Sequence, residues 1–214
     1  MHFHTSDQAR LSLGIGDYSC NWGVHIAGLY ETPEERDEII YGFLGEGVRA
    51  GDLQLYVPSE QSPDDFRAGM TRRIPEAAAR VNDPSWFQTP PPEALYYPNG
   101  YFSPREMDQA GEAFFAQSQA AGPRNIRATT EMVWALRAIP GREHLLAYEA
   151  RLNYFIPPKP WISICMYNVT SFDGATIMGV LRTHPYVISK GILTENPYYQ
   201  DPEAWLQENA PEFL

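Results

Sequence analysis

Six residues of types that bind ligands or move protons stand in largely apolar surroundings in this sequence. They are His25, Tyr30, Glu131, Trp134, Glu149 and Cys165. The two glutamates are the most informative of these residues, because burying a carboxylate costs free energy unless it is paired, hydrogen-bonded or functional. His25 lies in the middle of an apolar run, where it is either a hydrogen-bonded core residue or a ligand contact. We take these six as candidate ligand-binding residues and assign none of them a catalytic role.

Each candidate also has a purely structural interpretation. Arg151 follows Glu149 closely, and a buried Glu–Arg pair would explain a glutamate as well as a bound ligand does. Tyr30 and Trp134 could line an apolar pocket, but 13% of the chain is aromatic and such side chains commonly build the core. The sequence contains no G-x-S-x-G motif and no Cys/His pattern typical of a nucleophile with its base, so no enzyme class is favoured.

Four residues have the chemistry of metal ligands but lie far apart in the sequence. Cys20, His25, Cys165 and His184 show neither C-x-x-C nor H-x-x-x-H spacing. His184 precedes Pro185 at the end of an expected helix, where the helix dipole favours a cation. The spacing therefore predicts no metal site, and we expect no other cofactor.

The elements that must position these residues begin with an apolar strand at residues 22–30. A helix follows, with Thr32 as N-cap, Pro33 at its first position and Glu35 completing a capping box. Apolar residues recur at i, i+4 spacing along it, and Gly51 ends it. The sequence thus predicts a strand followed by an amphipathic helix at the start of the domain.

The same alternation continues along the chain. We expect strands at 53–57, 86–88, 95–97, 125–130 and 161–167, and a hairpin at 186–194. We expect helices at 62–74, 103–121, 142–155 and 173–184, and a short one after 201. Alternating strands and helices predict an α/β fold of three layers, a mainly parallel sheet with helices on both faces. Residues 1–17 are weakly patterned, so we expect a flexible N-terminal arm before a single domain at 18–214.

The loop after the first strand is the default ligand site in such folds, since strand ends and helix N-termini meet there. A nucleotide-hydrolysing protein carries a glycine-rich loop with Lys followed by Ser or Thr at this place. Residues 28–35 read GLYETPEE, with one glycine, no lysine, three carboxylates and a proline that removes a backbone donor. We therefore expect no ATP binding of the usual kind.

Charge and hydropathy restrict the partners. The formal net charge is -11, with 27 acidic residues against 16 basic ones, which disfavours nucleic acids and anionic membranes. No apolar run approaches the roughly 18 residues of a membrane span, and the N-terminus lacks the apolar core of a secretory signal. A reducing cytoplasm is the simplest compartment for a chain with two cysteines this far apart.

Several segments in a fixed order resemble one known family. The segments are WGVHIAGLYETPEE, EGVRAGDLQLYV, GYFSP, IRATTEMVWAL, LLAYEARLN, ICMYN, VLRTHPYVI and NPYY. Together they cover roughly residues 20–200 and resemble the MEDS family, a sensory domain first described in methanogens and methylotrophs. The resemblance implies a fold similar to RecA and KaiC in which the phosphate loop is lost. It also implies a sensory role, with small organic molecules such as hydrocarbon derivatives as ligands.

The sequence departs from this family at two points. Ala27 stands where relatives commonly have a cysteine, and no helix-turn-helix or kinase segment is attached. We therefore expect a stand-alone sensory domain that binds a small, largely apolar organic ligand and signals through a regulatory protein such as a kinase or an anti-sigma factor. The sequence does not decide whether the chain forms a homo-oligomer. The alternatives are an enzyme that uses a buried glutamate as general acid/base, and a scaffold protein without a ligand.

Overall fold

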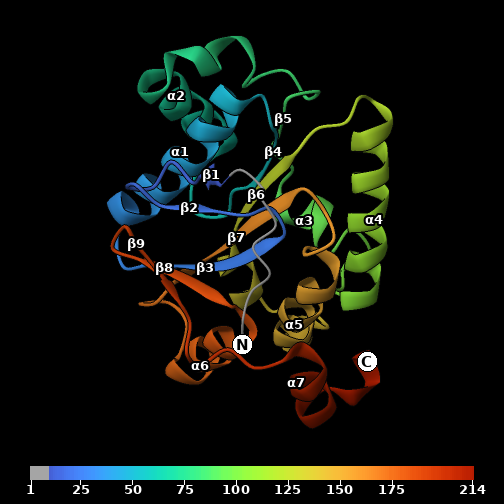
Figure 1. Ribbon diagram of the computed structural model, residues 1–214. Helices are drawn as coiled ribbons and strands as arrows, with labels where there is room; N and C mark the ends of the chain where they lie inside the picture. The colour runs from blue at the N-terminus through green and yellow to red at the C-terminus, as the bar shows by residue number, and fades with distance from the viewer. Residues whose placement is uncertain (1–9) are drawn as a thin grey trace.

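The computed structural model describes residues 10–214 and has a seven-stranded sheet at its centre (Figure 1). The strand order is β5-β4-β6-β7-β3-β8-β9. Their bounds are β3 Val24–Tyr30, β4 Leu53–Val57, β5 Phe87–Gln88, β6 Ile126–Glu131, β7 Trp161–Asn168, β8 Tyr186–Ser189 and β9 Ile192–Glu195. All neighbours pair in parallel except β8 and β9, which form an antiparallel hairpin. The predicted mainly parallel sheet is confirmed.

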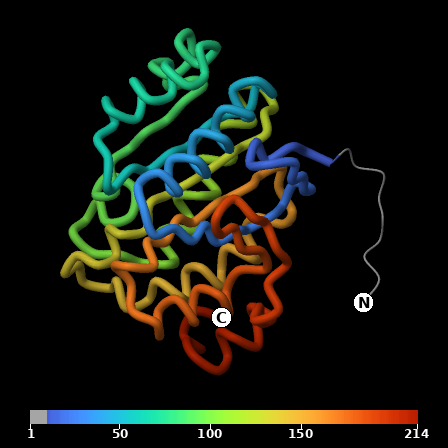
Figure 2. Tube along the Cα trace, turned by 90° about the vertical axis from the view of Figure 1, so that its left-hand side faces the viewer, coloured from blue at the N-terminus to red at the C-terminus, as the bar shows by residue number. Residues whose placement is uncertain are grey.

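Helices cover both faces of this sheet. One face carries α1 (Pro33–Ala50), α2 (Pro63–Arg73), a 3-10 helix (Pro75–Ala79) and a small hairpin of β1 (Leu11–Ser12) and β2 (Ser19–Cys20). The other carries α3 (Pro92–Leu95), α4 (Pro104–Ala120), α5 (Leu145–Phe155) and α6 (Gly174–Thr183), with 3-10 turns at Met132–Leu136 and Arg142–His144. The chain ends in α7 (Pro202–Asn209) and a 3-10 turn (Pro211–Phe213). Figures 1 and 2 both place α7 at the end of the molecule opposite α2.

The strands are apolar on both sides because both faces of the sheet are covered. Successive side chains of a strand point to opposite faces, so β3 sends Ile26 and Tyr30 into the core under α1 and Ala27 and Leu29 into the core under α5. This alternation decides which polar side chains can meet. Within residues 10–214 no helix is long and apolar enough to cross a bilayer.

The helices begin where the cap residues predict. The side chains of Thr32, Ser62, Ser103, Asp173 and Asp201 each accept a hydrogen bond from a backbone N–H in the first turn of the helix that follows. Gly51, at a φ of 79°, ends α1 in the left-handed conformation that glycine adopts without strain.

Two sequence predictions about local structure are wrong. Residues 95–97 are expected to form a strand, but Pro92–Leu95 is a helical turn in which the Tyr96 N–H bonds to the Pro92 carbonyl. The proline at the first helical position favours that turn over a strand. The expected flexible arm is wrong for residues 10–17, because Leu13 and Ile15 are buried against α1. Residues 1–9 of the expected arm lie outside the described residues.

A buried ion pair joins two neighbouring strands at their N-terminal ends. Arg127 Nε lies 2.7 Å from Asp52 Oδ2, and the two side chains are 1% and 2% exposed. Arg127 also donates to the Ser12 carbonyl, which ties the β1–β2 hairpin to the sheet. Removing one member of such a pair leaves an uncompensated charge in the core.

We predict that Asp52→Ala lowers the free energy of unfolding by about 3–5 kcal/mol, because Arg127 then stays buried without its counter-ion. Urea denaturation followed by circular dichroism measures the change. Asp64→Ala serves as the matched control, since the Asp64 side chain is 96% exposed in its pair with Arg67. This control should cost at most about 1 kcal/mol. Equal effects of the two substitutions would contradict the assignment.

Candidate functional site

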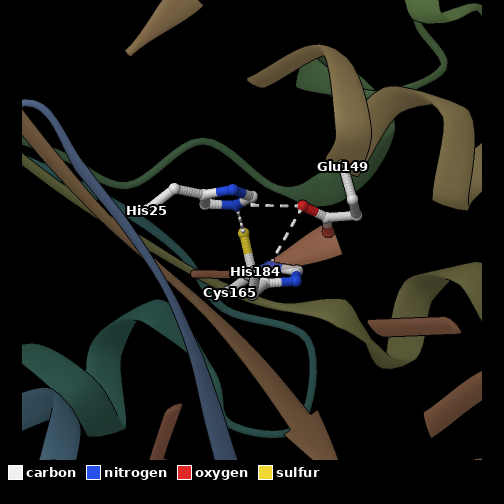
Figure 3. Close-up of side chains that lie close together, drawn as sticks. All are labelled: His25, Glu149, Cys165 and His184. Atoms are coloured by element: carbon white, nitrogen blue, oxygen red, sulfur yellow. Dashed lines mark hydrogen bonds and ion pairs between the residues drawn. The ribbon is translucent and has the colours of Figure 1, made fainter. Parts of the chain in front are cut away.

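Four buried side chains from four separate elements meet under α5 (Figure 3). They are His25 of β3, Glu149 of α5, Cys165 of β7 and His184, which follows the last residue of α6. His25 Nε2 lies 3.1 Å from Glu149 Oε2, and His184 Nε2 lies 3.4 Å from the same oxygen. Cys165 Sγ lies 3.5 Å from His25 Nε2. We call these residues the His25–His184 cluster.

The fold brings these four side chains together through register and helix packing. In the sheet Ala27 pairs with Cys165 and His25 pairs with Ser163, so His25 and Cys165 lie on the same face and two residues apart in register. Glu149 lies on the face of α5 that is buried against the sheet. α6 packs on α5, which places His184 beside Glu149. All four side chains are at most 3% exposed.

Hydrogen bonds on the outer side of each ring fix the histidine tautomers. His184 Nδ1 lies 2.8 Å from the Val180 carbonyl, an acceptor only, so this nitrogen carries the proton. Asn153 directs its amide N–H groups to the carbonyls of Glu149, Ala150 and Thr183. The Asn153 Oδ1 atom therefore faces His25 Nδ1 at a distance of 3.3 Å. Because an amide oxygen only accepts, His25 Nδ1 must carry the proton of this hydrogen bond. In their neutral forms both rings thus direct an Nε2 lone pair into the cluster.

The protonation states follow from burial. Burial lowers the pKa of His25 to about 4, with repulsion from His184 acting in the same direction, so His25 is neutral at pH 7. Burial alone would raise the pKa of Glu149, but His184 and His25 outweigh it and hold that pKa well below its usual range. Burial raises the pKa of the Cys165 thiol well above its ordinary value. The cluster therefore contains a carboxylate and, without a bound cation, a protonated thiol.

Two other predicted site residues, Tyr30 and Glu131, lie on the opposite face of the sheet. The Tyr30 hydroxyl donates to Glu60, 2.5 Å away, and Arg36 lies between Glu60 and Glu131. The Glu131 carboxylate accepts from the Tyr56 hydroxyl and from the backbone N–H groups of Ser59 and Glu60. With Arg36 Nε 3.5 Å away as well, Glu131 is fully occupied in holding the loop after β4.

An apolar cavity of about 220 Å³ lies between the sheet and the helices α4 and α5. Its wall consists mainly of aromatic and aliphatic side chains, including Tyr96, Phe114, Tyr148, Phe155 and Trp161. Gln88, Thr130, Ser163 and Cys165 are the polar or sulfur-bearing residues that the sheet contributes to it. Cys165 belongs both to this cavity and to the His25–His184 cluster, so the two features share a wall.

The six residues predicted from the sequence therefore do not line one pocket. His25, Glu149 and Cys165 come together, whereas Tyr30 and Glu131 lie across the sheet. Trp134 is buried in the core, where its ring stacks on Tyr96 at a centroid distance of 4.4 Å.

The alternative interpretation, in which Arg151 pairs with a buried glutamate, does not hold. Arg151 binds Asp108 of α4 and the Phe213 carbonyl, so it joins α5 to α4 and to the C-terminal turn. Glu149 instead faces His25 and His184, and Glu131 faces Arg36.

From the sequence, His184 is interpreted only as a residue at a helix end and as one of four potential metal ligands that lie far apart in the chain. Cys20, the fourth of these, lies on the α1 face, and Glu149 takes its place in the cluster. The informative feature is that His25 and Glu149 each interrupt an apolar segment, and that Cys165 lies in the most apolar strand, all in the same sheet layer. Motif spacing could not find the cluster, because its members come from four different elements.

The loop that would bind phosphate in a nucleotide site is closed on itself. Only Glu31 and Thr32 separate the end of β3 from the start of α1 at Pro33. The Thr32 hydroxyl accepts from the Glu35 N–H, and the Glu35 carboxylate accepts from the Glu31 N–H. The backbone donors that a phosphate would use are therefore bound within the chain, next to carboxylates.

Solved structures of low sequence identity share this fold. A KaiC-like protein, PH0186 from Pyrococcus horikoshii OT3, is 13% identical, with a TM-score of 0.57 over 84% of this chain and 79% of that one. The flagellar accessory protein FlaH from Methanocaldococcus jannaschii is 16% identical, with a TM-score of 0.56 over 91% and 89% of the two chains. The expected KaiC-like α/β fold is confirmed.

Sequence comparison identifies the family. The transcriptional repressor DcmR of Methylorubrum extorquens (strain DSM 6343 / CIP 106787 / DM4) is 24% identical over 161 residues, which are 75% of this chain and 57% of that repressor. The model of the MEthanogen/methylotroph, DcmR Sensory domain matches residues 24–185, a range that contains the whole His25–His184 cluster and all the residues that line the cavity. The chain therefore belongs to the MEDS family of sensory domains.

Proposed function

We propose that this sensory domain binds a small, largely apolar organic molecule in the cavity between the sheet, α4 and α5. The observation that carries the proposal is the cavity itself, an unfilled apolar space in the layer that the sheet and these helices enclose. Cavities lined by apolar side chains stay dry and accept apolar guests, and one of about 150 Å³ suffices for benzene. At about 220 Å³ this cavity suits a molecule of that size or slightly larger.

Polar atoms on the sheet side of the cavity supply selectivity. The Tyr96 hydroxyl donates to Thr130 Oγ1 at 3.0 Å, and Ser163 and Cys165 add a hydroxyl and a thiol to the same wall. A few polar groups within an apolar lining are typical of ligand sites, where they fix the orientation of the guest. A hydrocarbon derivative with one small polar substituent satisfies both parts of this wall.

The outer wall is the part of the cavity that can respond to occupancy. Of the 17 residues of α4, only Pro104, Met107 and Ser118 are buried, and its other core contacts come from half-buried side chains such as Phe114 and Phe115. Weakly packed elements are the ones that move on binding. α5, the other helical wall, packs directly on α7, which gives a contact route from the cavity to the C-terminal surface.

The output of the domain is proposed to be contact with a regulatory protein. The related DcmR is a transcriptional repressor, which supports a role in regulating transcription for this chain as well. The surface formed by α4 and α7 is the place where a kinase or an anti-sigma factor would sense the occupied state, since both helices pack on α5.

The geometry favours ligand binding over general acid/base catalysis. Glu131 already accepts from three donors and faces Arg36, which leaves no oxygen for a substrate. Glu149 has its pKa held well below the usual range by His184 and His25, whereas a general acid at neutral pH needs a raised pKa.

We predict that Ala110→Phe weakens the binding of small apolar probes such as toluene by about tenfold or more, because the new ring occupies cavity volume. Ala110 lines the cavity from α4 and is also solvent-exposed, so the helix should tolerate the change. Ligand-induced shifts of methyl NMR signals measure the affinity.

Ala116→Phe is the matched control for this prediction. Ala116 lies on the same helix, is also exposed and does not line the cavity, so its substitution should leave the affinity unchanged. Equal losses in both variants, or saturable toluene binding by Ala110→Phe with wild-type affinity, would place the ligand elsewhere.

We also predict that the domain has no measurable affinity for ATP at physiological concentration, because the closed loop after β3 offers carboxylates instead of free N–H groups. Isothermal titration with ATP and magnesium should give only the heat of dilution. Saturable, magnesium-dependent binding in the micromolar range would show that this loop still functions as a nucleotide site.

A further inference from the structure

We propose that the His25–His184 cluster is a tetrahedral zinc site in which His25, Glu149, Cys165 and His184 each contribute one ligand atom. The proposal goes beyond the binding of an organic molecule and does not depend on it. It rests on the positions of the four ligand atoms, on the hydrogen bonds behind them and on the polar atoms left without a partner.

The distances between ligand atoms fit a tetrahedron around one ion. Zinc lies about 2.0–2.2 Å from nitrogen or oxygen and about 2.3 Å from sulfur, which gives tetrahedral edges of about 3.3 Å for N–O pairs and about 3.6 Å for N–S pairs. The observed separations are 3.1 and 3.4 Å for the two N–O pairs and 3.5 Å for the Cys165–His25 pair. All four atoms lie within 4.8 Å of one another, so the longest separation must shorten by about 1 Å on binding.

Hydrogen bonds behind the ligands orient them toward the centre. The Val180 carbonyl holds the Nδ1 proton of His184, and the Asn153 side chain holds that of His25. The Tyr167 hydroxyl donates to Glu149 Oε1, which leaves Oε2 free to bind. A metal-bound histidine almost always donates its second N–H to an acceptor, and a metal-bound carboxylate is itself hydrogen-bonded. The cluster shows both features.

Two atoms at the centre lack a hydrogen-bond partner. Glu149 Oε2 and His184 Nε2 are fully buried, and neither has a hydrogen bond within the described residues. The two atoms lie 3.4 Å apart, and either a proton on His184 or a metal ion between the two groups makes this contact favourable. A positive charge is therefore needed between these groups, and the convergence of His25 Nε2 and Cys165 Sγ on the same point favours a metal ion over a proton as its source.

The ligand set selects the metal and its role. Two imidazoles, one thiolate and one carboxylate form a mixed nitrogen, sulfur and oxygen set that suits Zn²⁺. Zinc binding displaces the Cys165 proton to solvent, so the charges of Zn²⁺, the thiolate and the carboxylate sum to zero. Four protein ligands complete the tetrahedron, and the ion therefore ties β3, β7, α5 and the end of α6 together instead of offering an open position for catalysis.

The test begins with the metal content of the full chain. After removal of bound metal and titration with Zn²⁺ in competition with a chromophoric chelator, we expect one tightly bound ion per chain and a raised Tm. Titration with Co²⁺ reports the geometry. We expect strong visible d–d absorption, which indicates a tetrahedral ion, and a near-ultraviolet thiolate-to-cobalt charge-transfer band.

The two cysteines of the chain provide a matched pair of variants. Both are free and buried, but only Cys165 belongs to the cluster. Cys165→Ser should abolish the charge-transfer band and weaken zinc binding at least about hundredfold, as loss of a direct ligand exceeds the 10–100-fold effect of outer-shell changes. Cys20→Ser should retain both the band and the affinity. Far-ultraviolet circular dichroism verifies that each variant is folded.

His184→Gln tests the residue at the centre of the proposal, since glutamine retains most of the side-chain volume. We expect it to lose stoichiometric zinc while retaining the near-wild-type spectrum of the metal-free chain. A charge-transfer band that persists in Cys165→Ser, or a wild-type chain that binds zinc no more tightly than Cys165→Ser, would overturn the zinc site. The cluster would then be held together by a proton on a histidine.

Discussion

The coverage of the central sheet on both faces is the constraint on which the rest of the molecule depends. With helices on each side, most residues of the central strands are buried, and a polar side chain must find its partner on its own face. Glu131 and Thr130 are consecutive in β6, yet Glu131 binds the loop after β4 on the α1 face and Thr130 lines the cavity on the α5 face. The same alternation places His25 and Cys165 together and Tyr30 across the sheet from them.

The architecture could be predicted from the sequence because it is encoded locally. Helices α1, α2, α4 and α6 each follow a cap residue with a side-chain oxygen, although α5 does not, and β4 lies where the apolar run predicts it. The element at 95–97 was missed because an aromatic run next to prolines fits a strand and a helical turn equally well, and tertiary packing of Tyr96 against Trp134 decides between them. The burial of Leu13 and Ile15 was missed because their alternation with Leu11 is short and contains two glycines, which makes it a weak strand signal.

The candidate site was predictable residue by residue but not as an arrangement. A buried acid or histidine is visible in the sequence, since it interrupts an apolar segment, and His25 and Glu149 stand out in this way, whereas Cys165 is predicted as a site residue from its place in an apolar strand. Their grouping depends on the strand order, which places β7 between β6 and β3, and on α6 packing against α5. No local pattern fixes either feature. The difference between Glu131, which holds a loop, and Glu149, which faces two histidines, likewise arises only from the partners that the fold supplies.

Cys165 links the two features that this face of the sheet contains. Its backbone lies in β7, its thiol points toward His25, and its side chain also forms part of the cavity wall. Glu149 and Tyr148 are consecutive in α5, one in the cluster and the other in the cavity wall. The contacts that hold Glu149 against β3 and β7 therefore also position one wall of the cavity, whereas α4 has only three buried residues. In the proposed ligand-binding role, the α5 side would set the shape that a guest must match, and the position of α4 would report that the guest has bound.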